Sequence, residues 1–261
     1  MVEPPSQRDP TRRFSDRVEY YVRSRPKYPP VLLEFCRGQL GLVAGHRIAD
    51  IGSGTGFLSE VFVHNGNEVF AVEPNAEMRA AAETALGGFP NFHSVDARAE
   101  ATGLENSSVD CVTAGQAFHW FDRARCREEF KRILRPDGWV VLAWNQRQSV
   151  EGFAGAYEKI VQEFQIDLAQ VEHKAVTARS SDALSKFFHP GNYAVETFAN
   201  PQWLDLDGVI ARAHSSSYLP LPSQPRADEM LERLHHAFAA HAQDGKVKLY
   251  YVTRIFYGRL I

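Results

Sequence analysis

The chain has 261 residues, of which 44% are hydrophobic, and a formal net charge of −3 at pH 7. This length and composition suit one large globular domain, with or without a helical addition. The charge balance shows no basic excess of the kind that nucleic-acid-binding domains carry, so we expect no nucleic-acid partner. No apolar run approaches the roughly 20 residues that a membrane-spanning helix needs, so we expect no membrane partner.

The cysteines and the polar start of the chain bear on its compartment. Cys36, Cys111 and Cys126 are odd in number, lie far apart and form no Cys-x-x-Cys pair. This spacing argues against a disulfide framework and a metal site, and it favours a reducing compartment. The segment 1–13 lacks the apolar region of a signal peptide. We therefore expect a cytoplasmic protein without a bound metal, either a monomer or a homodimer.

The predicted elements begin with a polar, disordered segment at residues 1–13 and two lead-in helices up to about residue 40, separated by the prolines of Arg25–Pro30. An alternation of apolar strands and helices follows. The strands are expected at 47–51, 68–72, 91–95, 109–114 and 139–144, and the helices at 57–64, 76–86 and after Asp122. Strands separated by helices indicate a mainly parallel sheet with helices on both faces.

After residue 145 the alternation changes. Residues 150–188 are predicted to be mostly helical, and residues 193–204 alternate like a strand. Helices are expected at 207–214 and 226–243, and a closing strand at 246–257, where apolar residues share one parity.

The first predicted strand runs into the glycine-rich turn Gly52-Ser53-Gly54-Thr55-Gly56. Glycine allows positive φ angles and close approach of a ligand, and the following helix start presents free N–H groups. A dinucleotide-binding turn reads Gly-x-Gly-x-x-Gly, whereas here the third glycine comes one place early and Phe57 follows it. The spacing favours another nucleoside-type site. Tight packing of strand on helix is the alternative reason for such a turn.

Carboxylates follow the next two strands. Glu73, about 20 residues beyond the first glycine, can accept hydrogen bonds from a ribose diol. Asp96 stands where a carboxylate and a neighbouring backbone N–H can bind an adenine edge. The alternatives are an exposed loop acid for Glu73 and a turn-capping residue for Asp96.

The loop Gly115–Phe121 after the fourth strand holds three aromatic residues and His119. It lies where the ligand crevice of an α/β sheet opens, so these rings are expected either to wall a binding site or to pack in the core. His119 is the candidate general base, since histidine titrates near working pH. The alternative is a histidine packed between its aromatic neighbours.

In combination, these motifs resemble the class I S-adenosylmethionine-dependent methyltransferases. The matching segments are Asp50–Gly56, Val72–Asn75, Asp96–Glu100, Ser108–Asp110, Gln116–Phe121 and Arg132–Gly138. Residues 14–29, 217–220 and 250–253 are similar to the small-molecule branch that includes trans-aconitate methyltransferases. Asp137 departs from the pattern, because the family often has a second glycine there.

The resemblance implies an α/β, Rossmann-like fold. Its sheet is expected to have seven mainly parallel strands in the order 3-2-1-4-5-7-6, with strand seven antiparallel, flanked by helices and with helices added after strand five. We accordingly divide the chain into an N-terminal arm with lid helices (1–40), an S-adenosylmethionine-binding core (41–146), and helical insertions with strands six and seven (147–261). The last part belongs to the same domain and is expected to cap the substrate.

The resemblance also implies S-adenosylmethionine as the cofactor and S-adenosylhomocysteine as the product. The expected cofactor-binding residues, including two from the predicted lid, are Gly52, Ser53, Gly54, Thr55, Glu73, Pro74, Asn75, Met78, Asp96, Ala97, Gln116, Ala117, Tyr20 and Arg25.

The function that this pattern predicts is methyl transfer to a small-molecule acceptor by in-line displacement, mainly through proximity and orientation. A base such as His119 is needed only if the acceptor loses a proton, and Arg25 could bind a carboxylate acceptor. The alternatives are a non-catalytic cofactor-binding protein and a nicotinamide-dependent oxidoreductase. A base-modifying nucleic-acid methyltransferase fits less well, because Gln116–His119 replaces its Asn/Asp-Pro-Pro-Tyr motif. The acceptor and the methylated atom stay open.

Overall fold

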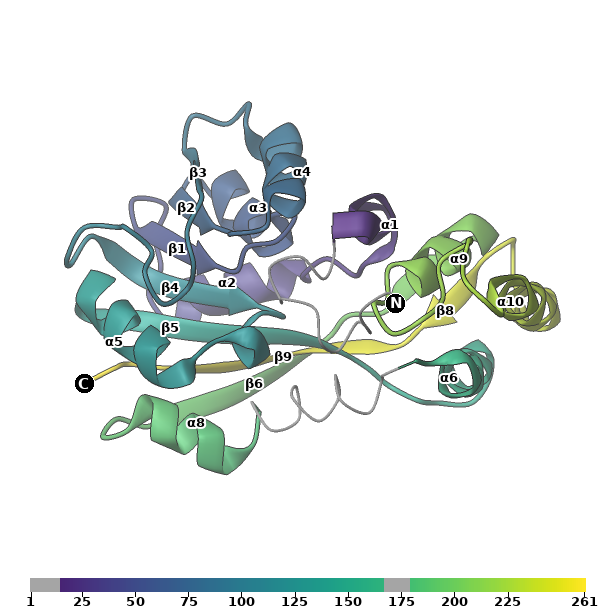
Figure 1. The fold of residues 1–261 in the computed structure, drawn as a ribbon. Coiled ribbons are helices and arrows are strands. Elements are labelled where there is room, and N and C mark those ends of the chain that lie inside the picture. The colour runs from purple at the N-terminus through teal and green to yellow at the C-terminus, as the bar shows by residue number, and fades with distance from the viewer. Residues whose placement is uncertain (1–14, 167–178) are drawn as a thin grey trace. The chain divides into compact units, whose positions relative to one another are not determined.

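The computed structural model describes residues 15–166 and 179–261 (Figure 1). Contacts divide the chain into two compact units. The first contains the described parts of residues 1–26, 146–173 and 199–252, and the second those of residues 27–145, 174–198 and 253–261. We call the first the helical unit and the second the sheet unit. The predicted disordered segment 1–13 lies outside the described residues, as does the part of the predicted helical region at 167–178.

A seven-stranded sheet forms the centre of the sheet unit, with the order β3-β2-β1-β4-β5-β9-β6. The strands are β1 (Arg47–Ile51), β2 (Glu68–Val72), β3 (Phe92–Val95), β4 (Val109–Gly115), β5 (Leu134–Arg147), β6 (Tyr193–Ala199) and β9 (Tyr251–Gly258). The pairs from β3 through β5 are parallel, and β9 runs opposite to β5 toward the C-terminus (Figure 1). Since β9 is the seventh strand of this sheet in chain order, the predicted fold and strand order are confirmed.

Helices cover both faces of this sheet because its strands carry apolar side chains of both parities. Ile48 packs with buried residues of α2 (Pro30–Gln39), α3 (Phe57–His64) and α4 (Ala76–Leu86). Its neighbour Ala49 belongs to a second buried cluster, which includes residues of α5 (Arg123–Ile133) and α8 (Ser181–Phe188). The result is a helix–sheet–helix sandwich, as expected for a parallel sheet.

Local signals set the helix starts as the sequence predicts. Asn75 caps α4 by accepting a hydrogen bond from the Met78 N–H, and Asp122 caps α5 by accepting from the N–H groups of Ala124 and Arg125. Such caps satisfy N–H groups that have no partner within the helix. They also position the residues just before each helix, which stand at the carboxyl ends of β2 and β4.

Three predicted strands differ from the structure by more than one residue. β5 begins at Leu134 rather than 139, and its residues 135–138 bulge opposite the single residue Asp110 of β4. Asp137 lies in this bulge with φ of 63°, the backbone region that glycine favours, which accounts for the glycine often found there in the family it resembles. The predicted strand 193–204 divides into β6 and β7 (Gln202–Leu204), and the strand 246–257 divides into β8 (Val247–Leu249) and β9.

The helical unit has its own apolar core. It contains η2 (Ser15–Arg17), α1 (Val18–Ser24), α6 (Phe153–Phe164), α9 (Leu206–His214), α10 (Ala227–His241) and the antiparallel pair β7–β8. Buried residues such as Tyr157, Val209 and Leu234 pack together in it. Arg17 fastens the start of α1 to the end of α9, because its guanidinium donates to the carbonyl of His214 at 2.7 Å.

No helix within residues 15–166 and 179–261 combines the length and the apolar character that a membrane crossing requires.

Candidate functional site

The three positions Gly52, Gly54 and Gly56 in the turn between β1 and α3 are occupied by glycine for different structural reasons. A Cβ at Gly52 would lie 2.6 Å from the Ala117 Cβ, and one at Gly56 would lie 3.0 Å from Leu86 Cδ1. Close packing therefore explains both. Gly54 also has a positive φ, of 57°, but a Cβ there would meet nothing within 4 Å. Packing alone thus does not account for Gly54, which borders open space.

Two hydroxyl groups of the same turn are unsatisfied within the described part of the chain. Ser53 Oγ and Thr55 Oγ1 are buried atoms, and neither has a hydrogen-bond partner there. Thr55 itself is 4% exposed. Buried polar atoms in native proteins nearly always have a partner, from the protein, water or a ligand. Together with the open space at Gly54, these hydroxyls fit a polar ligand bound against the turn.

Glu73 at the end of β2 is held firmly beside the turn. Its Oε2 accepts from the Gly54 N–H and its Oε1 from the Asn75 N–H, each at 2.9 Å. The side chain is buried, and burial raises the pKa of Glu73, whereas these two hydrogen bonds and the charge of Arg79 lower it. Each carboxylate oxygen keeps a further lone pair, so Glu73 can still accept two hydrogen bonds from a ligand.

Arg79 connects the ends of β2 and β3. Its Nη1 donates to the Glu73 carbonyl at 2.8 Å, and its Nη2 binds Asp96 Oδ2 at 2.9 Å. Asp96 is otherwise solvent-exposed, and this ion pair replaces the turn cap considered from the sequence. Sequence reasoning missed Arg79. The available signal was a basic residue one turn after the Asn75 cap, where a long side chain can reach back to the strand ends.

Beneath the turn, Asp50 ties β1 to its neighbours. Its buried carboxylate accepts from Ser59 Oγ at 2.7 Å and from Thr113 Oγ1 at 3.0 Å. Burial raises the pKa of Asp50 to about 6, despite these hydrogen bonds, and the nearby charge of Glu73 raises it further. The last residues of β1, β4 and the start of α3 are therefore joined through one side chain.

The residues after β4 are also held in place. Gln116 has φ of 58°, and its Nε2 donates to the Asn145 carbonyl at 2.9 Å. Asn145 Oδ1 in turn accepts from Thr253 Oγ1 at 2.6 Å. These contacts fix the ends of β4 and β5 to β9. A Cβ at Gly115 would collide with the Tyr28 hydroxyl, which places that tyrosine against the end of β4.

The aromatic side chains of the loop Gly115–Phe121 differ in their burial. Phe118 is fully buried and packs edge-on against Phe187, with ring centroids 4.7 Å apart, so it belongs to the core. His119 lies half-buried in η3 (Phe118–Trp120), 4.7 Å from the Trp120 ring centroid. Phe121 packs on the glycine turn. The role of His119 as a base stays a prediction.

The structure brings most of the predicted residues to one edge of the sheet. The turn 52–55 and the segments 73–75, 96–97 and 116–117 follow β1, β2, β3 and β4, whose parallel pairing sets their carboxyl ends side by side. Met78 is buried in the first turn of α4. Tyr20 and Arg25 belong to the helical unit, where they contact His214 and Ser215, respectively. Their contribution to cofactor binding stays a prediction.

Comparisons with known proteins find similarity to methyltransferases. Residues 49–142 match the model of a family described as a methyltransferase domain. An uncharacterised methyltransferase of Mycobacterium tuberculosis is 37% identical over 156 residues, which cover 60% of this chain and 61% of the relative. The chain thus spans about three-fifths of the length of the curated relatives it matches.

Solved structures show the same fold. A type II methyltransferase from Anaeromyxobacter dehalogenans superposes with a TM-score of 0.65 at 21% identity, covering 91% of this chain and 98% of the other. An S-adenosylmethionine-dependent methyltransferase from Geobacter sulfurreducens, solved with S-adenosylhomocysteine, gives 0.52 at 17% identity, covering 95% and 98%. Residues 49–142 are thus similar to a methyltransferase domain, and the strand order agrees with the fold of these solved structures.

Proposed function

We propose that the protein transfers a methyl group from S-adenosylmethionine to a small-molecule acceptor. One combination of features carries this proposal: the same turn has open space at Gly54, unpartnered Ser53 and Thr55 hydroxyls, and a Gly54 N–H that holds the Glu73 carboxylate. Packing explains neither the open space nor the hydroxyls. A ligand that carries both a ribose diol and a polar amino-acid group would satisfy all three features.

Each part of this edge has a proposed role. Gly52, Ser53, Gly54 and Thr55 would hold the amino-acid part of the cofactor, and Glu73 would accept from the ribose hydroxyls. Pro74, Asn75, Met78, Asp96, Ala97, Gln116 and Ala117 would surround the nucleoside. When bound, the cofactor supplies a methyl group activated by a positively charged sulfur, with a neutral leaving group.

The protein's own contribution is mainly positional. Arg79 fixes Asp96 and the Glu73 backbone before any ligand arrives, which lowers the ordering cost of binding. His119 would take a proton from an acceptor that has to lose one. We propose that residues 1–40 act as a lid and that the helical insertions within residues 147–261 act as a substrate cap, with Tyr20 and Arg25 contributing from the lid.

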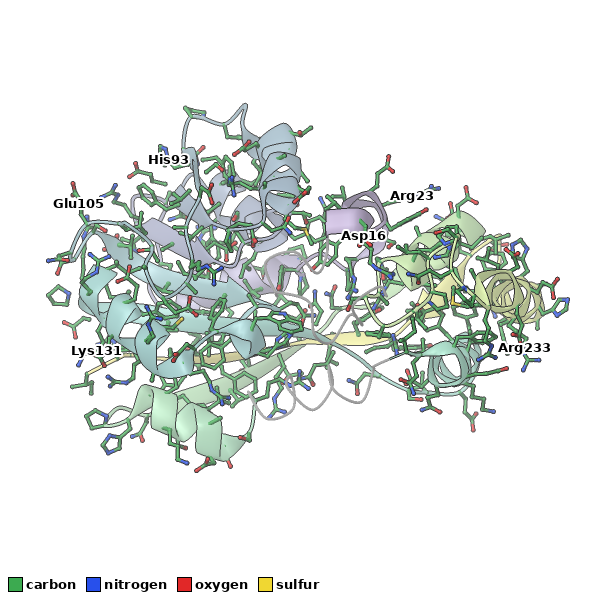
Figure 2. The ribbon with its side chains drawn as sticks, viewed as in Figure 1. Asp16, Arg23, His93, Glu105, Lys131 and Arg233 are labelled. Carbon is green, nitrogen blue, oxygen red and sulfur yellow. The ribbon has the colours of Figure 1, made fainter. Side chains whose placement is uncertain are left out.

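Calorimetry on the full chain tests the cofactor. We expect S-adenosylhomocysteine to bind and nicotinamide dinucleotides not to bind. Glu73→Gln should weaken S-adenosylhomocysteine at least tenfold, since charge-assisted hydrogen bonds contribute about 1.5–3 kcal/mol each. Glu105→Gln is the matched control, because Glu105 is an exposed acid of the same unit (Figure 2). Tight dinucleotide binding without S-adenosylhomocysteine binding would overturn the proposal.

A second measurement separates an enzyme from a cofactor-binding protein without activity. Release of S-adenosylhomocysteine is followed with a panel of small acids, phenols and amines. We expect release with at least one class and none without an acceptor. Cofactor binding with no release across the panel would instead support the non-catalytic alternative.

A further inference from the structure

Three guanidinium groups gather in the helical unit, and three tyrosine side chains surround them. The arginines are Arg25, Arg147 and Arg212, and the tyrosines are Tyr157, Tyr218 and Tyr251. They come from residues 25, 147–157 and 212–251, which all belong to this unit. Arg212 is 3% exposed, and the Arg147 side chain keeps 12% of its surface exposed. The cluster is therefore largely desolvated without being sealed from solvent.

The hydrogen bonds within the cluster leave several guanidinium donors unused. Arg212 Nε donates to Tyr251 Oη at 2.9 Å and its Nη1 to Ser216 Oγ at 2.8 Å. Arg25 directs Nε and Nη2 to Ser215. Arg212 Nη2 and Arg25 Nη1 have no acceptor in the described part of the molecule. A guanidinium carries five N–H donors, so the neutral oxygens present do not use them all.

The cluster also has more positive than negative charge. Arg147 binds the Glu158 carboxylate at 3.0 Å and lies over the Tyr157 ring, 5.1 Å from its centroid. Among the described residues, Glu158 is the one carboxylate that bonds to any of the three guanidiniums. Three positive charges thus face one negative charge in a buried setting, where unbalanced charge is costly.

The hydroxyl groups of two tyrosines bear on whether the cluster can bind an anion. Tyr157 Oη is fully buried and has no hydrogen-bond partner among the residues described. Burial alone would raise the pKa of Tyr218, but the nearby guanidiniums of Arg147, Arg212 and Arg25 lower that pKa to about 8. An anion bound here would balance the charge and accept hydrogen bonds from the unused donors.

We propose that Arg147, Arg212 and the hydroxyl groups of Tyr157 and Tyr218 form a binding site for an oxyanion, a carboxylate or a phosphate group. Planar guanidiniums suit both, because two parallel N–H groups match two oxygens of either anion. Binding of the anion at this cluster does not depend on the proposed function.

Tyrosinate absorbance during a pH titration tests binding without any catalytic assay. The Tyr218 step is identified as the difference between the wild-type protein and Tyr218→Phe. We expect inorganic phosphate or succinate to move this step toward the ordinary tyrosine pKa of about 10, because added negative charge opposes ionisation. The shift should saturate with concentration, and sodium chloride at the same ionic strength should not reproduce it.

Variants show whether the anion binds at this cluster. Arg147→Gln should weaken the anion at least tenfold, and Arg147→Lys should weaken it less, since the charge stays. Arg233→Gln is the matched control, because Arg233 is an exposed arginine on α10 of the same unit (Figure 2). Circular dichroism checks that each variant is folded. If Arg147→Gln does not fold, the Arg147→Lys variant and the wild-type titration still test whether the anion binds at the cluster.

Phosphate and succinate are titrated in separate experiments. A response to one identifies the anion class, and a response to both supports a shared oxyanion site. No saturable shift with either anion, or an equal shift in Arg147→Gln, would show that the cluster is an internal structural network and overturn the proposal. Calorimetry with S-adenosylhomocysteine on the wild-type protein separates the two claims. Cofactor binding without anion binding refutes this site, and anion binding without cofactor binding refutes the proposed function.

Discussion

Replacing Gly54 by alanine tests whether the glycine turn binds a ligand or only packs. The new Cβ would meet no atom within 4 Å, so the change introduces no clash in the protein. The positive φ of 57° would still strain an alanine by about 1–2 kcal/mol. For a unit of this size, that corresponds to a melting temperature lowered by roughly 2–8 °C. The methyl group would, however, stand in the space assigned to the cofactor, so we expect S-adenosylhomocysteine affinity to fall at least tenfold.

Gly41→Ala is the matched control for this variant. Gly41 has φ of 67°, a Cβ there also meets nothing within 4 Å, and it precedes β1 rather than following it. Both variants should therefore lose similar stability, while only Gly54→Ala should lose affinity. Calorimetry with S-adenosylhomocysteine and thermal unfolding measure the two effects separately. Unchanged affinity in Gly54→Ala would refute the reading of the open space as a binding site.

Three further predictions concern stability and thiol reactivity. Hydrogen bonds from Arg132 and Thr102 lower the pKa of Glu129 from 4.5 to about 2, which corresponds to about 3 kcal/mol of stability. Because the pKa of Glu129 is lower in the folded protein, this contribution is present above about pH 4.5 and is lost as the pH falls toward 2. Urea unfolding should show that Glu129→Gln is less stable than the wild-type protein at pH 7. This difference in the free energy of unfolding should disappear in acid. Arg17→Met should lower the free energy of unfolding by about 3 kcal/mol, because carbonyls of the helical unit lose a charged donor. Arg17→Lys should recover part of this loss. Identical unfolding curves for Arg17→Met and the wild-type protein would contradict the prediction. The three cysteines are buried and free, and burial raises the pKa of Cys36 to about 12. A thiol reagent should therefore label them only after unfolding. Rapid labelling of the native protein would be inconsistent with the structure.

Local patterns predicted much of the sheet unit. β1, α3, β2 and α4 begin and end at the residues that the sequence indicated. Their boundaries come from short-range features: apolar runs, a glycine after a strand, and the Asn75 side chain at a helix start. Such features act within a few residues, so they can be recognised in the sequence without knowledge of the tertiary structure.

Longer strands were harder to predict because their limits depend on partners distant in the chain. Residues 193–204 alternate continuously, yet β6 joins the large sheet while β7 pairs with β8. Pro201 has no N–H to donate to a ladder, which agrees with a break at that point. The β5 bulge similarly depends on how residues 135–138 meet Asp110 of the neighbouring strand.

The sequence by itself determined the order of strands and helices, the glycine turn, and a carboxylate after each of two adjacent strands. The tertiary structure decided what these residues do. It showed that Gly52 and Gly56 serve packing while Gly54 borders open space, and that Arg79 joins Glu73 to Asp96. It also brought Arg25, Arg147 and Arg212 into one cluster. Periodicity and caps are encoded in neighbouring residues, whereas charge balance and open space arise only when distant segments pack together.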